Sequence, residues 1–229
     1  MHPGPVGLAC DTSTEQQAIA LWEKDRITVE WSLGTRGGTS RGLAGDIAMV
    51  LARRGLDPRD LDFLVTSLGP GSFTGVRVVM STLKGMAMAL GKPLFGVDVL
   101  GTLAWPHRGR AVLAALDARR GEVYGAAWAP DGSPLVPPGA LRAEALASRV
   151  AKRLPAGARV LAVGDGVLAW REALEREMGD RLDVGAPRDH LVRASAMIEQ
   201  VLDGTLAPLD PASVEPIYLR RPDAEVPRT

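Results

Sequence analysis

The tetrapeptide Asp11-Thr12-Ser13-Thr14 combines residue types that could hold a magnesium-bound phosphate. It ends a short apolar run, Val6–Asp11, which is typical of a buried strand. A carboxylate at a strand end can face the metal ion, while backbone N–H groups of the turn face the phosphate oxygens. The same residue types also close ordinary hairpin turns. Two alternatives therefore stand: a weak nucleotide or phosphate contact through Asp11, Thr12 and Ser13, or a plain turn.

The segment Gly69–Arg77, with the sequence GPGSFTGVR, is the most specific pattern in the chain. Its glycines allow positive φ angles, and Ser72 suits the N-cap of a following helix, whose free N–H groups could bind an anion. The segment lacks the Gly-Lys-Ser/Thr of a P-loop and the G-x-G-x-x-G spacing of a Rossmann turn. We predict a glycine turn that opens a helix and offers a potential anion site.

Two later turns could also contact a ligand. Asp117 ends a second apolar run and precedes Ala-Arg-Arg-Gly-Glu, so we interpret it as a second phosphate-side carboxylate. Gly164 opens a Gly-Asp-Gly turn, where a two-lobed nucleotide-binding fold would place an adenosine contact; taken alone, it is a loop. The turns after Asp11 and Asp117 both lack the glycine that lets a phosphate approach closely. We therefore predict weak binding of ATP, with a dissociation constant above roughly 0.1 mM.

Groups for metal or nucleophilic catalysis are missing from the sequence. His2, His107 and His190 are widely separated, with no His-x-x-x-His pair to ligate a metal. The only cysteine, Cys10, lies in an apolar strand, where an inert thiol is expected, and no G-x-S-x-G elbow exists. We expect no catalytic residue, no metal and no cofactor in the isolated chain.

The composition is that of a globular protein, with 46% hydrophobic and 24% charged residues among 229. It excludes a disordered chain, a collagen-like chain and a coiled coil. Because 27 basic residues balance 27 acidic ones, tight autonomous binding of nucleic acid is disfavoured, although a local basic patch is compatible with this balance. The sequence has neither a secretory signal nor an uncharged span of 18 residues, so we expect a cytoplasmic protein without a membrane segment.

Strands alternate with helices along the chain, which predicts an α/β fold that starts with three antiparallel strands. Predicted strands are 6–11, 18–22, 27–31, 61–68, 94–97, 112–117, 123–128 and 159–163, and predicted helices are 40–54, 73–90, 142–153, 169–178 and 194–202.

Three residue pairs share one spacing of 106 positions and suggest an internal duplication. The pairs are Asp11 with Asp117, Trp22 with Trp128, and Asp25 with Asp131. We therefore predict two similar lobes, residues 1–105 and residues 106–229.

The helices predicted at Ser40–Arg54 and Phe73–Leu90 carry small or apolar residues on more faces than one core can use. Such a helix is either a central core helix or one shared with a second chain. Small residues would let two helix pairs approach closely across a two-fold axis; these are Gly42, Gly45, Ser81 and Gly85. We predict a homodimer in isolation, with an interface formed by Leu43, Ile47, Val50, Phe73, Val76, Val79, Leu83 and Met86.

Four sequence blocks together resemble the bacterial TsaB family, formerly called YeaZ. They are Asp11–Thr14, Gly69–Arg77, the block LDARRGEVY at 116–124 and the block EPIYLR at 215–220. The blocks follow the family's order and span nearly the whole chain.

The resemblance implies an actin-like fold of two ribonuclease-H-like lobes. It also implies a role in making N6-threonylcarbamoyladenosine (t6A) at position 37 of tRNA. TsaB-type proteins are inactive paralogues of a catalytic TsaD-type subunit, which they scaffold, and a TsaE-type ATPase docks on the pair. The resemblance also implies that this chain contacts tRNA only as part of the complex, and that the complex can bind ATP or ADP.

Two other functions remain as alternatives at this stage. A phosphotransferase of the actin-like fold, such as a sugar or acetate kinase, would need glycine-rich phosphate loops in both lobes and a catalytic carboxylate. A metallopeptidase would need metal ligands, which the sequence does not supply.

Overall fold

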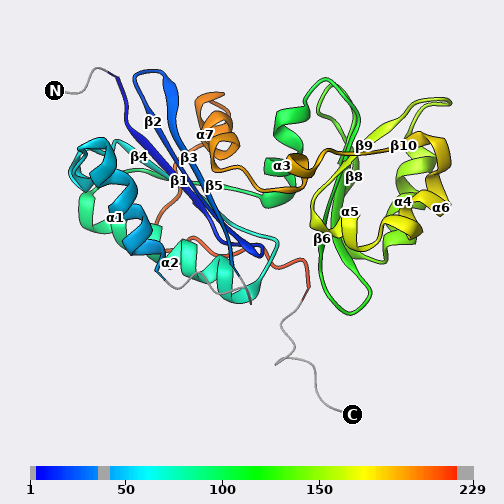
Figure 1. Ribbon diagram of the computed structural model, residues 1–229, viewed down its shortest axis with the longest axis horizontal. Coiled ribbons are helices and arrows are strands. Elements are labelled where there is room, and N and C mark those ends of the chain that lie inside the picture. Colours follow the sequence, from blue (N-terminus) through cyan, green and yellow to red (C-terminus); the bar gives the residue numbers. More distant parts are fainter. Residues whose placement is uncertain (1–3, 36–41, 221–229) are drawn as a thin grey trace, which may run out of the picture. The chain divides into compact units, whose positions relative to one another are not determined.

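The computed structural model describes residues 4–35 and 42–220. The chain forms two compact units (Figure 1). Unit 1 comprises Met1–Thr102 and Val192–Pro216, and unit 2 comprises Leu103–Leu191 and Ile217–Thr229. The predicted lobes have a single boundary, after residue 105. Unit 1 also includes the later segment Val192–Pro216, so the compact units are not continuous in sequence.

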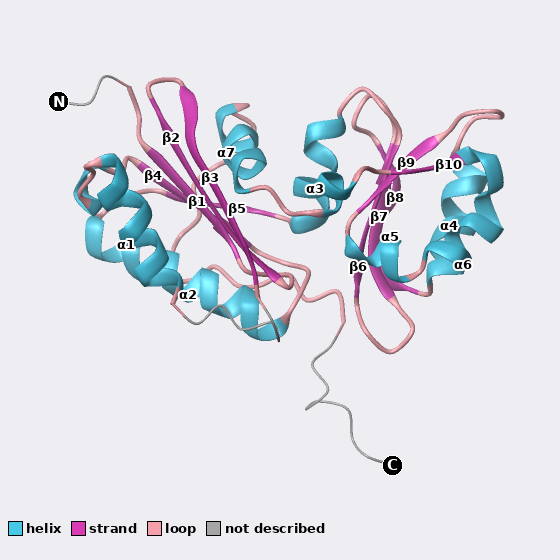
Figure 2. Cartoon of the chain, in the orientation of Figure 1, coloured by secondary structure: helices cyan, strands magenta, loops and turns pink. Residues whose placement is uncertain are grey.

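Unit 1 is built on a five-stranded sheet with the order β3-β2-β1-β4-β5. Figure 2 draws its strands in magenta. Its strands are β1 (Gly7–Asp11), β2 (Gln16–Glu23), β3 (Arg26–Gly34), β4 (Phe63–Ser67) and β5 (Leu94–Val97). Strands β1, β2 and β3 pair antiparallel, which confirms the predicted start of the fold, and β1, β4 and β5 run parallel.

Helices cover both faces of this sheet (Figure 1). Helices α1 (Leu43–Arg54) and α2 (Phe73–Leu90) pack on one face, and α7 (Ala194–Leu202) packs on the other. The predicted bounds of α2 are confirmed: the Ser72 hydroxyl accepts a hydrogen bond from the Gly75 N–H, and Gly91 ends the helix at φ 65°. The predicted start of the first helix at Ser40 lies outside the described residues; α1 begins after Gly42.

Unit 2 repeats this plan with the strand order β10-β9-β6-β7-β8. Its strands are β6 (Val112–Asp117), β7 (Val123–Trp128), β8 (Pro134–Leu141), β9 (Val160–Val163) and β10 (Leu182–Val184). The remaining helices are α3 (Val99–Ala104), at the change from unit 1 to unit 2, α4 (Ala143–Arg153), α5 (Asp165–Ala169) and α6 (Arg171–Met178), with 3-10 turns at Pro58–Asp60, Trp105–His107, Gly179–Arg181 and Pro187–His190. Helices α4 and α6 pack on one face of the sheet.

Both five-stranded sheets contain three antiparallel strands and three parallel strands that share the central strand, in the same order, so the predicted α/β class is confirmed. Strand β8 was not predicted, because Pro134, Pro137 and Pro138 argue against a strand; the sheet tolerates them since β8 is an edge strand. No helix in the described ranges is long and apolar enough to cross a membrane.

Candidate functional site

The two N-terminal motifs meet in unit 1. The Ser72 N–H donates to the Ser13 carbonyl oxygen at 2.7 Å, and the Thr12 hydroxyl donates to the Gly75 carbonyl oxygen at 2.6 Å. A β-carbon at Gly71 would overlap the Ser13 carbonyl group, and one at Gly75 would overlap the Thr12 carbonyl group. The D-T-S-T turn therefore lies directly on the backbone of the glycine turn.

This contact uses part of the helix start at which the sequence predicted a potential anion site. The Ser72 N–H binds Ser13, and the Gly75 N–H binds the Ser72 hydroxyl. Of the glycines, Gly69 has a positive φ of 96°, whereas Gly71 and Gly75 are required for close approach rather than for their backbone angles. The start of α2 is a packing surface for the neighbouring turn.

Asp11 is fully buried at the end of β1. Its Oδ1 accepts the Ser13 N–H at 3.2 Å, while Oδ2 makes no well-formed hydrogen bond to any described residue. Burial raises the pKa of this carboxyl above its ordinary value, and the hydroxyls of Ser67 and Ser13 only partly oppose that shift. A buried carboxyl without a cation is costly, and such groups cluster at functional sites. Ser67 was not among the predicted site residues, although a polar residue ending a buried strand is a usable signal.

The two C-terminal motifs meet in unit 2. The Arg220 guanidinium donates to the Ala118 carbonyl oxygen at 3.0 Å, pairs with the Glu122 carboxylate and lies 5.9 Å from the centre of the Tyr124 ring. Between Ala118 and Glu122, Arg119 and Arg120 adopt positive φ angles of 61° and 56°. The block that ends at Arg220 thus holds the β6–β7 turn.

The candidate contacts Asp117 and Gly164 are likewise engaged within unit 2. The Asp117 carboxylate accepts the Arg119 N–H at 3.0 Å, and the Asp117 N–H donates to Asp165 at 3.0 Å. Gly164 has no room for a β-carbon, which would overlap the Ala115 carbonyl group. The five candidate contacts fall into two sets: Asp11, Thr12 and Ser13 belong to unit 1, and Asp117 and Gly164 belong to unit 2.

The shared spacing of 106 residues does not make Asp11 and Asp117 structural equivalents. In β1, Leu8 and Cys10 pack towards α1 and α2, so strand alternation places Asp11 on the opposite face, with Ala9. In β6, Leu113 and Ala115 pack towards α4 and α6, so alternation places Asp117 on that face. Since α1 and α4 occupy corresponding crossovers in the two sheets, the aspartates lie on non-corresponding faces.

Most of the predicted partner-interface residues lie in the core of unit 1. Those enclosed, each at most 3% exposed, are Leu43, Ile47, Val50, Val76, Val79 and Leu83. Met86 is half-buried, and Phe73 is 46% exposed under the Arg77 guanidinium. An enclosed side chain offers no surface to a partner. These six residues therefore belong to the core of unit 1 and not to the predicted interface. The small residues Gly45, Ser81 and Gly85 are exposed.

His190 has a role that the sequence did not suggest. It is 6% exposed, and its ring nitrogens lie 3.0 Å from the Gly164 carbonyl oxygen and 2.9 Å from the Gly185 carbonyl oxygen. It therefore joins the ends of β9 and β10. No group of three or more metal-ligating side chains occurs among the residues that the structure describes.

Comparison with known proteins shows consistent similarity. A family model described as TsaD, tRNA N6-adenosine threonylcarbamoyltransferase, matches residues 40–131. TsaB of Escherichia coli is 39% identical over 128 residues, which cover 54% of this chain and 55% of that protein. The match thus spans about half the length of this relative. An uncharacterized protein of Mycobacterium tuberculosis H37Rv is 30% identical over 233 residues, covering 95% of this chain and 93% of that protein.

Solved structures show similarity to the same family. YeaZ from Pseudomonas aeruginosa superimposes with a TM-score of 0.74 at 26% identity, covering 94% of this chain and all of that one. Component A of (R)-2-hydroxyglutaryl-CoA dehydratase from Acidaminococcus fermentans shares the fold alone, with a TM-score of 0.50 at 14% identity over 87% of this chain and all of that one.

The repeated sheet order and these structural neighbours define an α/β protein of the actin-like class. Within that class, the chain belongs to the TsaB (YeaZ) family.

Proposed function

We propose that this chain acts in the biosynthesis of N6-threonylcarbamoyladenosine in tRNA as a non-catalytic scaffold subunit. In this role it supports a TsaD-type catalytic subunit, and a TsaE-type ATPase acts on the pair. The support is the family, whose E. coli member is named a tRNA threonylcarbamoyladenosine biosynthesis protein, and the match of residues 40–131 to the TsaD family model.

The observation that carries the non-catalytic role is the contact between the two N-terminal motifs. A phosphate-binding turn needs backbone N–H groups that face an open space. In this chain the Ser72 N–H is bonded to the Ser13 carbonyl oxygen, and Gly71 and Gly75 pack against the same turn. The glycines bring two segments of the protein together, and this close packing supports a structural role for the turn instead of phosphate binding.

The exposed face of α1 and α2 is our proposed partner surface. A β-carbon added at Gly45 or Gly85 would have no neighbouring atom within 4 Å, and Met88, on the same helix as Gly85, is 66% exposed. Small residues allow close approach of helices, and an exposed methionine adapts to different partners. We propose that this face forms a homodimer in isolation and receives the TsaD-type subunit in the complex.

The pathway role is tested in cells that lack the gene, by measuring t6A in digested tRNA with mass spectrometry. Expression of the chain is expected to restore the nucleoside, provided that the TsaD-type protein is present. In a reconstituted assay, omission of either protein is expected to abolish modification. Restoration by the chain without a TsaD-type protein would contradict the scaffold role.

The surface is tested with Met88→Glu and Gly85→Arg, which add charge where side chains are exposed. Both variants are expected to fold and to lose co-purification with the TsaD-type subunit. Val79→Glu is the contrasting variant: Val79 is fully buried, so a charge there is expected to unfold unit 1. Unchanged co-purification of Met88→Glu and Gly85→Arg would place the partner elsewhere.

Calorimetry with ATP and a phosphoryl-transfer assay with a panel of sugars and acetate separate the scaffold from an actin-like-fold kinase. The scaffold predicts a dissociation constant above roughly 0.1 mM and no transfer. Micromolar affinity together with transfer to any acceptor would favour the kinase.

A further inference from the structure

Three arginines stand in one row at the start of three parallel strands of unit 2. Arg110 lies two residues before β6, and Arg159 and Arg181 directly precede β9 and β10. Val112 is paired with Leu161, and Leu182 with Val160, so continuing the register backwards aligns Arg110, Arg159 and Arg181. We call these three residues the arginine row.

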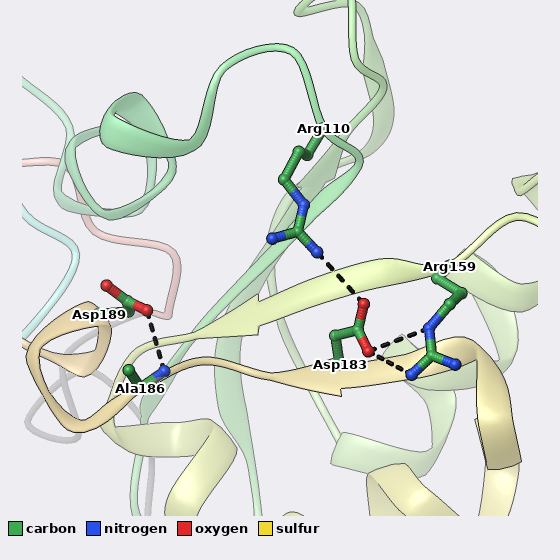
Figure 3. Close-up of polar contacts among 5 residues, drawn as sticks. All are labelled: Arg110, Arg159, Asp183, Ala186 and Asp189. Carbon is green, nitrogen blue, oxygen red and sulfur yellow. Dashed lines mark hydrogen bonds and ion pairs between the residues drawn. The ribbon is translucent and has the colours of Figure 1, made fainter.

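One carboxylate holds two members of the row together (Figure 3). The Arg110 guanidinium donates to one Asp183 oxygen at 3.2 Å, and the Arg159 Nε donates to the other at 3.0 Å. The Arg110 and Arg159 side chains are 56% and 55% exposed. The hydrogen bond from Arg159 holds the pKa of Asp183 below its ordinary value, so the carboxylate stays charged. The charge of Asp180 also acts on Arg159, so the three arginines of the row stand against two carboxylates and keep a net positive charge, with unused N–H donors on an exposed surface.

The third member of the row is anchored differently. Arg181 donates to the carbonyl oxygens of Ala151, Leu154, Pro155 and Ala158, in the last turn of α4 and the loop that follows it, at 3.0 to 3.3 Å. These contacts satisfy carbonyl groups that a helix end leaves without partners. Arg181 therefore adds positive charge to the row from a fixed position.

An aromatic platform precedes the row in the chain. The Arg108 guanidinium lies 3.6 Å from the centre of the Trp105 ring, and Arg108 is two residues before Arg110. The guanidinium covers this ring, so the outer face of Arg108, and not the ring, is the surface on which an unpaired RNA base could stack, and arginine forks match phosphate oxygens.

The net charge of the whole chain conceals an uneven distribution of basic residues between the two units. Unit 2 contains 16 Lys and Arg residues against 13 Asp and Glu, whereas unit 1 contains 11 against 14. A formal net charge of zero is thus the sum of a basic unit and an acidic one. The excess of basic residues thus belongs to unit 2, which also carries the arginine row.

We propose that the arginine row binds the sugar–phosphate backbone of RNA. The choice of RNA over another polyanion rests on the proposed role in tRNA modification. The row makes a weak contact that positions tRNA for the complex, because two exposed guanidinium groups supply few phosphate contacts.

The test is the affinity of the full chain for a fluorescein-labelled, unmodified tRNA transcript, measured by anisotropy over a series of salt concentrations from low ionic strength. Arg110→Gln combined with Arg159→Gln is expected to weaken binding several-fold. It is also expected to reduce the slope of log affinity against log salt by about 1.4, since each single-strand phosphate contact contributes about 0.7. Asp183→Asn is expected to tighten binding, because it removes the counter-charge and keeps both guanidinium groups. Loss of binding in Asp183→Asn would mean that the triad is structural only and would overturn the proposal.

Arg171→Gln is the matched control, because the Arg171 side chain is also 56% exposed and paired with a carboxylate, on α6. An equal loss of affinity in Arg171→Gln would overturn the row as the binding surface. Displacement of the tRNA by polyglutamate at equal charge would also overturn RNA as the ligand. The row and the proposed function fail separately: restored t6A with unchanged affinity in the Arg110 and Arg159 variant refutes only the row. Variant-dependent tRNA binding without restored t6A refutes only the function.

Discussion

Each unit joins two motifs that are distant in sequence, but backbone atoms make the contact in unit 1 and a charged side chain makes it in unit 2. In unit 1 the turn at Thr12 and Ser13 meets the glycine turn through backbone atoms, at Gly71 and Gly75, where a side chain would not fit. In unit 2 the β6–β7 turn is held by one charged side chain, Arg220.

The difference determines what each contact can tolerate. A backbone contact without side chains responds to any added volume but hardly to salt, because interiors are close-packed. A guanidinium contact to a partly exposed carboxylate responds to salt and contributes little stability. We therefore expect the unit 1 contact to be rigid and the unit 2 contact to be adjustable.

The largest expected effect comes from Gly75→Ala. The added methyl group would overlap the Thr12 carbonyl group, so the turn and α2 would have to separate, at a cost of about 1–3 kcal/mol. Chemical denaturation monitored by tryptophan fluorescence measures the loss.

Gly85→Ala is its control on the same helix, since no atom lies near that position. It is expected to stabilise the protein by up to about 1 kcal/mol through helix propensity. Equal stability changes in the two variants would show that the close contact at Gly75 has no energetic role.

Arg220→Ala should have a smaller effect. It removes the bond to Ala118 and the pair with Glu122, whose side chain is 37% exposed, so we expect a loss of about 1 kcal/mol that shrinks in high salt. Thermal unfolding at low and high ionic strength tests this, with Arg171→Ala as a control for an exposed ion pair within one helix. A loss that is independent of salt would assign the contact to packing on Tyr124.

A gain of stability at neutral pH is expected in Asp11→Asn. The asparagine oxygen can still accept the Ser13 N–H, and the buried charge is removed. Because the folded pKa of Asp11 is raised, the wild type loses stability as the pH rises from the ordinary carboxyl value through the folded one.

The advantage of the variant should therefore grow over that range and vanish in acid. Melting temperatures of the two proteins between pH 3 and pH 7 provide the measurement. A variant that matches the wild type in acid but is less stable above the folded pKa would mean that the carboxylate has a cation partner in solution.

Local sequence signals were sufficient to predict the bounds of several elements. Ser72 and Gly91 bound α2 at Phe73 and Leu90 as predicted, because an N-cap hydroxyl and a glycine at positive φ act within one helical turn. Strands β5, β6 and β7 also match their predicted ranges, since apolar runs between turns carry the same local signal. The four motifs were sufficient to indicate the family.

Tertiary structure decided what those motifs contact. Apolar residues at helical spacing, such as Ile47 and Val79, were predicted to face a partner but fill the core of unit 1, because spacing identifies a buried face and not what buries it. The role of Gly75 is also invisible in sequence, since a glycine needed for close approach looks like one needed for its backbone angles. The return of α7 to unit 1 and the alignment of the arginine row depend on strand register and long-range packing, which no local pattern encodes.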